Sequence, residues 1–381
     1  MGGLGEGRRM APEAAFWRAL PAARFKRSTE DGSLYTRGML GRRTFLTSLA
    51  AGTAATVLGA PPRIRIGQIG TQHPHASGKM EAVRGLPEIY EMVGVSGGER
   101  TESKVYEGVP RMSEGDLLAA PGLQAVLVET KIEDACTTAL RALRAGKHIH
   151  LDKPGSIEHA PFKAMRLEAE QRKLAVQMGY MLRYNPAFEL LFQAFREGWL
   201  GDILEIDAMM GKLADPATRK FIGTLPGGGM FELACHIIDA SLTLLGKPAE
   251  VHAFSAPTQP GDGIKDNQLA VLVYPKTTVT IRCNHADPFG GPRRRFQVAG
   301  TRGTLEIMPL ESGKATLWLN EAHGPWKKGE NSLRLPPPKG RYDAEFLDLA
   351  AVVRGEKSLA WSAMHDIAVH ETVLRAAGIS A

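Results

Sequence analysis

The fold is decided by residues 63–70, which read RIRIGQIG. Apolar side chains alternate along this stretch and a glycine ends it, as in a buried strand that leads into a tight turn. The next residues, TQHPHA at 71–76, open a helical pattern that runs to about Leu86. A strand, a glycine turn and a helix in this order predict the unit whose helix N-terminus holds the pyrophosphate of a dinucleotide.

Strands and helices continue to alternate after this unit. Strand patterns occupy residues 91–96, 123–128 and 148–151, and a helical pattern spans about 134–145. This rhythm is typical of a parallel, doubly wound sheet with helices on both faces. We therefore predict a Rossmann-type dinucleotide-binding domain of the α/β class at residues 63–181.

The pattern changes beyond Pro186, where strand-like segments follow one another with little helix between them. Residues 274–277 read YPKT and predict a hairpin turn. Strands are expected at about 203–210, 250–255, 268–274, 278–283, 295–299 and 304–308, and helices at about 343–353 and 362–377. We predict an α+β domain at residues 182–381 with a largely antiparallel open sheet, for binding substrate and for oligomerisation.

The distribution of charge argues against a nucleic-acid partner. The 381-residue chain has a formal net charge of +6, and residues 1–62 hold nine Lys and Arg against four Asp and Glu, or +5 of that total. The remainder is nearly neutral. A nucleic-acid-binding protein keeps its basic excess on the folded domain, so we exclude this class.

Cysteine spacing and hydropathy exclude two further classes. Cys136, Cys235 and Cys283 lie far apart, without the spacing of a metal motif and too few for a disulfide scaffold. We expect them to be buried thiols. Beyond residue 62 the sequence has no strongly apolar run of about 18 residues or more, so we predict no integral membrane segment once a leader is removed.

The first 62 residues read as a leader. Residues 41–46, GRRTFL, precede a mildly apolar run that ends near Ala60. A paired arginine ahead of such a run resembles a twin-arginine signal, and Met39 is an alternative start. We expect export to the periplasm or another extracytoplasmic space of a bacterium. A disordered basic N-terminus with a chance Arg-Arg pair is the alternative.

The turn after the first strand departs from the G-x-G-x-x-G fingerprint of dinucleotide sites. Gly70 takes the first glycine position, but Gln72 and His75 take the other two, and Thr71 lies between. We expect these residues to border the cofactor. After the second strand, Glu99 is a candidate for the ribose hydroxyls and Arg100 for a 2′-phosphate, which leaves NAD and NADP both open.

His73 and His75 allow three interpretations. They can contact the cofactor, bind a metal as a pair, or serve as polar residues where the helix starts. Spaced by two on a loop that enters a helix, they share no face well. We therefore treat both as candidate cofactor contacts and predict no metal site.

Four segments resemble the family of glucose–fructose oxidoreductase and inositol dehydrogenase (GFO/IDH/MocA). Residues 145–154, AGKHIHLDKP, resemble its a-G-K-H-V-x-x-E-K-P segment, with Asp152 in place of the usual glutamate. The others are GYMLRYNP at 179–186, GGGMFELACHIID at 227–239 and GTRGT at 300–304. The resemblance covers nearly everything from residue 63 onward. It implies an NAD- or NADP-dependent enzyme, and homo-oligomers built by pairing open sheets are common in the family.

The resemblance implies three catalytic residues. Lys153 follows a strand at the edge of the sheet where ligands bind, and its ammonium can stabilise a substrate oxyanion. His236 is the candidate general base, because the pKa of histidine lies near neutrality. Glu232, where the family usually has aspartate, would orient the substrate or tune His236. Asp152 and Lys153 are also candidate cofactor contacts.

A second group is expected to bind substrate where the two domains meet. A spacing of four predicts that Glu232 and His236 share one helical face, with Asp239 one turn further. Tyr180, Arg183 and Asn185 enter from the other segment, although a structural role at the domain joint is equally open for Arg183.

Together these features predict an NAD(P)-dependent oxidoreductase that acts on a hydroxyl of a small carbohydrate. Two alternatives stay open. One is a glycosidase of the same fold that oxidises, eliminates and re-reduces its sugar on a single NAD. The other is a sugar- or nucleotide-binding relative that has lost turnover.

Overall fold

The computed structural model describes residues 61–98, 103–336 and 340–380. Arg63–Ala381 form one compact unit. The predicted leader and twin-arginine signal, together with Glu99 and Arg100, lie outside the described residues. Within the described part, no helix is long and apolar enough to cross a membrane.

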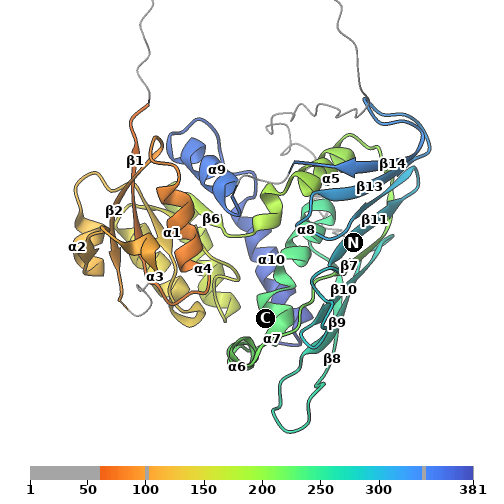
Figure 1. Ribbon diagram of the computed structural model, residues 1–381, viewed down its shortest axis with the longest axis horizontal. Coiled ribbons are helices and arrows are strands. Elements are labelled where there is room, and N and C mark those ends of the chain that lie inside the picture. Colours follow the sequence, from red (N-terminus) through yellow and green to blue (C-terminus); the bar gives the residue numbers. More distant parts are fainter. Residues whose placement is uncertain (1–60, 99–102, 337–339, 381) are drawn as a thin grey trace, which may run out of the picture. The chain divides into compact units, whose positions relative to one another are not determined.

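A parallel sheet of six strands forms the first lobe, in the order β3-β2-β1-β4-β5-β6 (Figure 1). Its strands are β1 (Ile64–Ile69), β2 (Tyr90–Ser96), β3 (Arg111–Met112), β4 (Ala125–Val128), β5 (His148–Leu151) and β6 (Val176–Met178). Its helices are α1 (Ala76–Arg84), α2 (Glu114–Ala119), α3 (Ile132–Arg144) and α4 (His159–Arg172). Every residue of β4 is buried, as expected for a strand covered on both faces.

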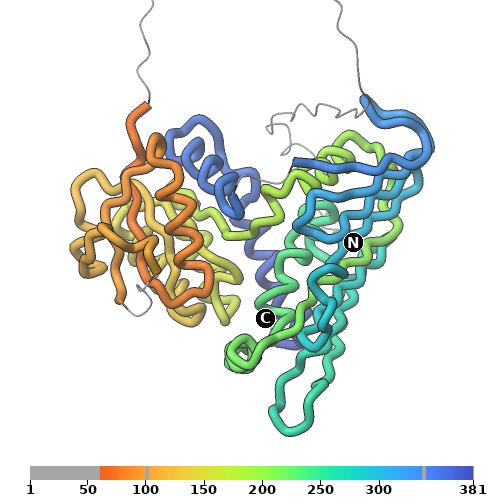
Figure 2. The backbone as a smooth tube through the Cα atoms, viewed as in Figure 1, coloured from red at the N-terminus to blue at the C-terminus, as the bar shows by residue number. Residues whose placement is uncertain are grey.

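The second lobe contains a sheet of eight strands in the order β14-β13-β12-β11-β7-β10-β9-β8, whose hairpins can be followed in Figure 2. Its strands are β7 (Ile203–Met209), β8 (Glu250–Ala256), β9 (Asn267–Val273), β10 (Thr278–Asn284), β11 (Arg295–Gly300), β12 (Gly303–Ile307), β13 (Lys314–Leu319) and β14 (Gly329–Arg334). Neighbours are antiparallel except for β7 and β10. The predicted fold class is confirmed by the two sheets and by the solved structures described below.

Helices cover one face of this second sheet. α5 (Pro186–Arg196) contacts β12, α8 (Cys235–Leu245) contacts β7 and β10, and α10 (Ala363–Ala376) contacts β8 and β9. Alternate residues of β9 and β10 are buried, as expected for an antiparallel sheet with one covered face. Two short helices, α6 (Pro216–Gly223) and α7 (Gly228–Glu232), precede α8. The first turn of α5 is fixed by Asn185, whose side chain accepts a hydrogen bond from the Ala187 N–H.

The helix α9 (Asp343–Val353), late in the chain, packs in the core of the first lobe. Tyr342, Phe346 and Leu349 share an apolar cluster with Ile64 of β1 and Leu127 of β4. Phe346 also meets Tyr90, whose hydroxyl donates a hydrogen bond of 2.6 Å to the Phe346 carbonyl. The first lobe is therefore completed by residues almost at the end of the sequence.

Phe346→Ala should test how much this late helix stabilises the protein. Phe346 is 0% exposed, and its neighbour Leu347 is 49% exposed. Removing a fully buried phenylalanine costs about 3–5 kcal/mol of unfolding free energy, whereas Leu347→Ala, as the matched control, should change it by less than about 1 kcal/mol. Denaturant unfolding of both variants measures the difference. Equal losses would mean that α9 is not part of the core.

Candidate active site

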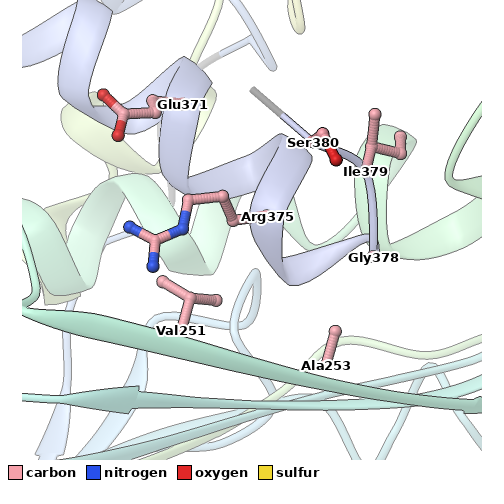
Figure 3. Close-up of a pocket in the computed structure, with 7 residues that line it drawn as sticks. All are labelled: Val251, Ala253, Glu371, Arg375, Gly378, Ile379 and Ser380. Carbon is pink, nitrogen blue, oxygen red and sulfur yellow. The ribbon is translucent and has the colours of Figure 1, made fainter.

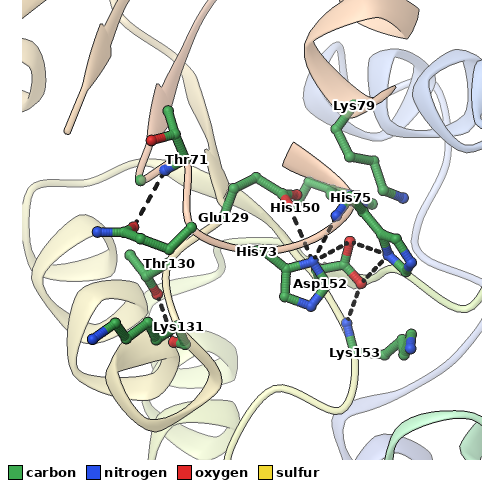
Figure 4. A network of polar contacts seen from close by, with 12 residues as sticks. Thr71, His73, His75, Lys79, Glu129, Thr130, Lys131, His150, Asp152 and Lys153 are labelled. Atoms are coloured by element: carbon green, nitrogen blue, oxygen red, sulfur yellow. Dashed lines mark hydrogen bonds and ion pairs between the residues drawn. The ribbon is translucent and has the colours of Figure 1, made fainter. Parts of the chain in front are cut away.

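The predicted site residues gather where parallel strands of the first sheet end. Gly70 follows β1, Glu129 follows β4, and Asp152 with Lys153 follows β5. Because β1, β4 and β5 are adjacent and parallel, these residues lie side by side at the carboxyl edge of the sheet. Figure 4 shows Glu129, Asp152 and Lys153 of this group. Ligands bind at this edge in open α/β folds.

The turn after β1 combines bare backbone with a buried hydroxyl. Gly70 has a φ of +87°, and a Cβ there would lie 2.7 Å from the backbone nitrogen of Thr130. Gly97, which follows β2 with a φ of +86°, lies against Gly70. The Oγ1 atom of Thr71 is buried and has no hydrogen-bond partner in the described part of the chain. Glycine backbone and an unsatisfied hydroxyl at this edge fit the phosphate and ribose groups of a dinucleotide.

Gln72 and His73 give the turn its unusual form. The side-chain oxygen of Gln72 accepts a hydrogen bond of 3.3 Å from the Thr71 N–H, and the His73 N–H donates to the Glu129 carbonyl at 3.0 Å. Two N–H groups of the turn are thus bonded within the chain. The missing second glycine therefore corresponds to a turn that offers fewer free donors to a phosphate.

His73, His75 and Asp152 form a cluster that sequence reasoning did not anticipate (Figure 4). The Nδ1 atom of His75 lies 3.0 Å from one oxygen of Asp152, and Nδ1 of His73 lies 3.5 Å from the same oxygen. Burial lowers the pKa of His73 to about 4, so its imidazole is neutral at neutral pH. His73 and His75 precede α1, so helical geometry does not turn their rings to different sides.

An ion pair joins the two lobes. The ammonium of Lys153 donates to the Glu232 carboxylate at 2.7 Å and to the Glu232 carbonyl at 2.6 Å, and Lys153 is buried. Burial alone would lower the pKa of Lys153, but the Glu232 carboxylate raises it above its ordinary value. In turn, burial would raise the pKa of Glu232, but the ammonium holds it below its ordinary value. Both groups are therefore charged.

The single helical face predicted for Glu232 and His236 is wrong. α7 ends at Glu232 and α8 begins at Cys235, with the Ala234 N–H bonded back to the Gly229 carbonyl. This break leaves the Glu232 carbonyl available as an acceptor for the Lys153 ammonium. The interruption thus positions both the carbonyl and the carboxylate of one residue against Lys153.

His236 lies in the second lobe at the start of α8 and is buried. Its Nδ1 atom has no hydrogen-bond partner among the described residues. Burial first, and then the nearby Lys153 ammonium, lowers the pKa of His236 well below its ordinary value. The ring of Tyr180 packs edge-on against it, with ring centroids 5.9 Å apart. His236 is therefore a neutral imidazole with a free ring nitrogen close to Lys153.

Three residues that were predicted to contact the substrate form hydrogen bonds within the protein instead. They are Arg183, Asn185 and Asp239. Arg183 donates to both oxygens of Asp239, at 2.6 and 2.9 Å, and to Asp366 at 2.7 Å. All three side chains are buried. Asn185 caps α5 and donates to the Leu310 carbonyl. These contacts agree with the structural role that was left open for Arg183.

The triple glycine at 227–229 serves close packing. A Cβ on Gly229 would lie 2.1 Å from the ring of His285, and one on Gly227 would lie 2.3 Å from Ala377 Cβ. His285 is a residue that sequence reasoning missed. It is buried, its Nε2 atom has no partner in the described chain, and burial lowers its pKa to about 4. Its only sequence signal is its place just beyond a strand.

A pocket of about 560 Å³ lies elsewhere, between β8 and the end of α10 (Figure 3). Its walls include Val251, Ala253, Glu371 and Arg375. None of the predicted site residues lines this pocket. It is therefore separate from the cluster around Lys153.

Comparison with known proteins identifies relatives of this chain. Residues 188–306 match the GFO/IDH/MocA C-terminal domain. The uncharacterized oxidoreductase YdgJ of Escherichia coli (strain K12) is 25% identical over 285 residues, which cover 74% of this chain and 78% of YdgJ. These matches support the resemblance of this chain to the GFO/IDH/MocA family. A trans-1,2-dihydrobenzene-1,2-diol dehydrogenase of Bos taurus is 24% identical over 235 residues, covering 59% of this chain and 69% of the relative.

Solved structures show the same fold at lower identity. The UDP-N-acetylglucosamine 3-dehydrogenase GnnA of Acidithiobacillus ferrooxidans has a TM-score of 0.70 at 18% identity, covering 84% of this chain and 98% of GnnA. An NAD binding oxidoreductase of Klebsiella pneumoniae has a TM-score of 0.70 at 16% identity, with coverage of 82% and 95%. The homologues are named oxidoreductases and dehydrogenases, which confirms the predicted enzyme class.

The low pKa of His236 generates a pH prediction. A general base must be unprotonated, and burial keeps His236 unprotonated until the pH falls well below about 6.5, the ordinary pKa of histidine. For any substrate that the protein turns over, kcat/KM should therefore stay constant as the pH is lowered through 6.5 and decline only at more acidic pH. Steady-state kinetics across this range provide the measurement. A loss of activity centred at or above pH 6.5 that disappears in His236→Gln would contradict it.

Proposed function

We propose that the protein is an NAD(P)-dependent oxidoreductase that acts on a hydroxyl of a sugar, polyol or related carbohydrate. One observation carries the proposal. A charged Lys153 from the first lobe meets Glu232 from the second, next to a neutral His236 with a free ring nitrogen. This group lies at the strand edge where the glycine turn fits a dinucleotide.

The three side chains have complementary roles. The free nitrogen of His236 takes the proton of the substrate hydroxyl. Lys153 stabilises the negative charge that develops on the same oxygen, because its ammonium is held charged in a site shielded from water. Glu232 is a positioning residue, since its carboxylate and carbonyl fix the ammonium from two directions. A bound nicotinamide supplies the acceptor for the hydride that leaves the carbinol carbon.

The residues that would hold the cofactor come from the first lobe. Gly70, Thr71 and Gln72 would hold the pyrophosphate, and His73, His75 and Asp152 would also contact the cofactor. Glu99 and Arg100 remain candidates for the ribose or its phosphate. The likeness to an NAD binding oxidoreductase supports a nicotinamide cofactor. The choice between NAD and NADP stays open.

The substrate class is supported by the relatives. One is named a dehydrogenase of a dihydrodiol and another a dehydrogenase of a nucleotide sugar, so both oxidise a carbon that bears a hydroxyl. Tyr180 is the candidate substrate contact that remains closest to the catalytic group, because its ring packs on His236. The side chains of Arg183, Asn185 and Asp239 form hydrogen bonds with other groups of the protein. These three residues would therefore position the site and not contact the substrate directly.

Lys153→Ala and His236→Ala test the assignment. Each variant should lower kcat/KM for the best carbohydrate substrate by more than about tenfold, because each removes a group that acts on the reacting oxygen. The measurement is the rate of formation of reduced nicotinamide, beside native mass spectrometry for a co-purified dinucleotide. Near-normal turnover in either variant removes that residue from the mechanism.

Matched controls separate catalysis from general effects of mutation. Lys163→Ala and His252→Ala change exposed residues of the same types outside the site and should leave kcat/KM unchanged. Thermal unfolding of all four variants checks that folding is preserved. Cleavage of a glycoside without net reduction of the nicotinamide would favour the redox-neutral glycosidase instead. A bound dinucleotide without turnover of any sugar would favour the binding protein.

We also propose that the leader directs twin-arginine export to the periplasm. The Arg42-Arg43 pair is the feature that such a route reads. Replacing both with lysine should lower the periplasmic fraction of the protein at least about tenfold. Cell fractionation followed by immunoblotting measures the partition. An unchanged periplasmic fraction would show that the pair is incidental.

A further inference from the structure

Imidazole nitrogens and carboxylate oxygens gather around the turn that follows β1. One ligand atom each from His73, His75 and Asp152 lies within 4.8 Å of the other two. Glu129 borders this group, with an oxygen 3.6 Å from Nδ1 of His73. His73, His75 and Asp152 are the edge cluster of this section, and dashed lines in Figure 4 connect each histidine to Asp152.

The contacts within the edge cluster do not form a complete set of hydrogen bonds. Nδ1 of His73 accepts only a long hydrogen bond, from the His75 N–H at 3.3 Å, so it has no proton for either carboxylate, and an ion would take this lone pair in place of the N–H. Its distances of 3.5 Å to Asp152 and 3.6 Å to Glu129 are also long for N–H···O bonds. Both oxygens of Glu129 are buried without a hydrogen-bond partner among the described residues.

The nearby lysines do not satisfy these oxygens either. The ammonium of Lys79 donates to Glu345 at 2.5 Å, and the ammonium of Lys153 donates to Glu232. Two imidazoles and the Asp152 carboxylate thus converge in the interior without a lysine or arginine side chain bonded to them in the described chain. Burial raises the pKa of the neighbouring Glu129 well above its ordinary value, so that carboxyl group is neutral there.

The distances match those between ligands of a single ion. Nitrogen and oxygen ligands lie about 2.0–2.2 Å from zinc, so two of them in a tetrahedral arrangement are about 3.4 Å apart. The separations of 3.0 Å from His75 and 3.5 Å from His73 to the same Asp152 oxygen bracket that value.

We propose that the edge cluster binds a divalent transition-metal ion of the zinc class. Two imidazoles and carboxylate oxygens form the mixed nitrogen and oxygen set that such ions prefer, whereas magnesium and calcium prefer oxygen alone. Asp152 is already oriented by the Lys153 N–H, which donates to it at 2.7 Å. His75 provides the entry path, because its side chain is 18% exposed while those of His73 and Asp152 are nearly inaccessible.

This site is next to the catalytic group, since Asp152 precedes Lys153, but it does not rest on the proposed function. It changes the interpretation of His73 and His75, which the sequence predicts as cofactor contacts and not as metal ligands. Its ligands follow β1 and β5, so an ion there would tie the ends of these two strands together. Loss of the ion should therefore lower the thermal stability of the first lobe.

Cobalt titration of the full chain tests the proposal without substrate or cofactor. After removal of metal with a chelator, Co²⁺ should bind at about one ion per chain and give the visible absorption bands of an inner-sphere nitrogen and oxygen site, which Zn²⁺ then abolishes. Absence of these bands would overturn the proposal and leave the cluster as a proton-sharing network.

Two variants localise the ion. His75→Ala should weaken Zn²⁺ binding at least about tenfold in calorimetric titration, because it removes a direct ligand. His159→Ala is the matched control, since His159 is 15% exposed and contacts His370 and Glu371 away from the cluster. Equal affinity in His75→Ala and the parent, or an equal loss in His159→Ala, would overturn the assignment.

X-ray absorption keeps the test decisive if His75→Ala does not fold. At the zinc edge, the unmodified protein should show imidazole scatterers at about 2.0–2.1 Å. A shell made of oxygen only, or containing sulfur, would place the ion elsewhere and contradict the proposal. Failure of the oxidoreductase tests leaves these results unaffected, because none of them requires turnover.

Discussion

The ion pair between Lys153 and Glu232 is the interaction on which the site depends. It joins the end of β5 in the first lobe to the end of α7 in the second, and both partners are nearly inaccessible to solvent. A buried pair of this kind adds little net stability, but removing one partner costs about 3–5 kcal/mol because the other charge is stranded. The pair therefore fixes which atoms of the two lobes face each other.

Much of the fold could be predicted because its signals are local. The alternation in residues 63–70 and the run AVLV of β4 need only neighbouring residues to be read. The strands β3 and β6 were missed because they have two and three residues, too few for a period to be seen. The packing of α9 on β1 could not be predicted, because its apolar face fits either lobe and only the three-dimensional arrangement selects one.

The residues of the candidate site were selected by resemblance, and their geometry was harder to predict. Lys153, Glu232 and His236 were selected because their segments resemble those of the GFO/IDH/MocA family. The helical face was wrong because a spacing of four assumes an unbroken helix, and the chain breaks between Glu232 and Cys235. His73 and His75 were separated by the same assumption, whereas the irregular turn brings both nitrogens to Asp152. Periodicity arguments fail where the backbone leaves regular structure, and here that is where the chemistry lies.

The molecule contains two kinds of buried polar cluster, and the contrast between them points to function. Arg183 forms hydrogen bonds with Asp239 and Asp366, His365 adds a contact to Asp239, and Arg166 forms an ion pair of 2.8 Å with the other Asp366 oxygen, so each carboxylate meets a cation. Thr71 and Glu129 at the sheet edge, and His236 on α8, each keep a buried polar atom without a hydrogen-bond partner among the described residues. Folding alone gives no benefit from such atoms, since each loses its water and gains no bond. Their cost is offset only if something outside the chain completes them, which makes the edge, and not the Arg183 network, the place for ligands.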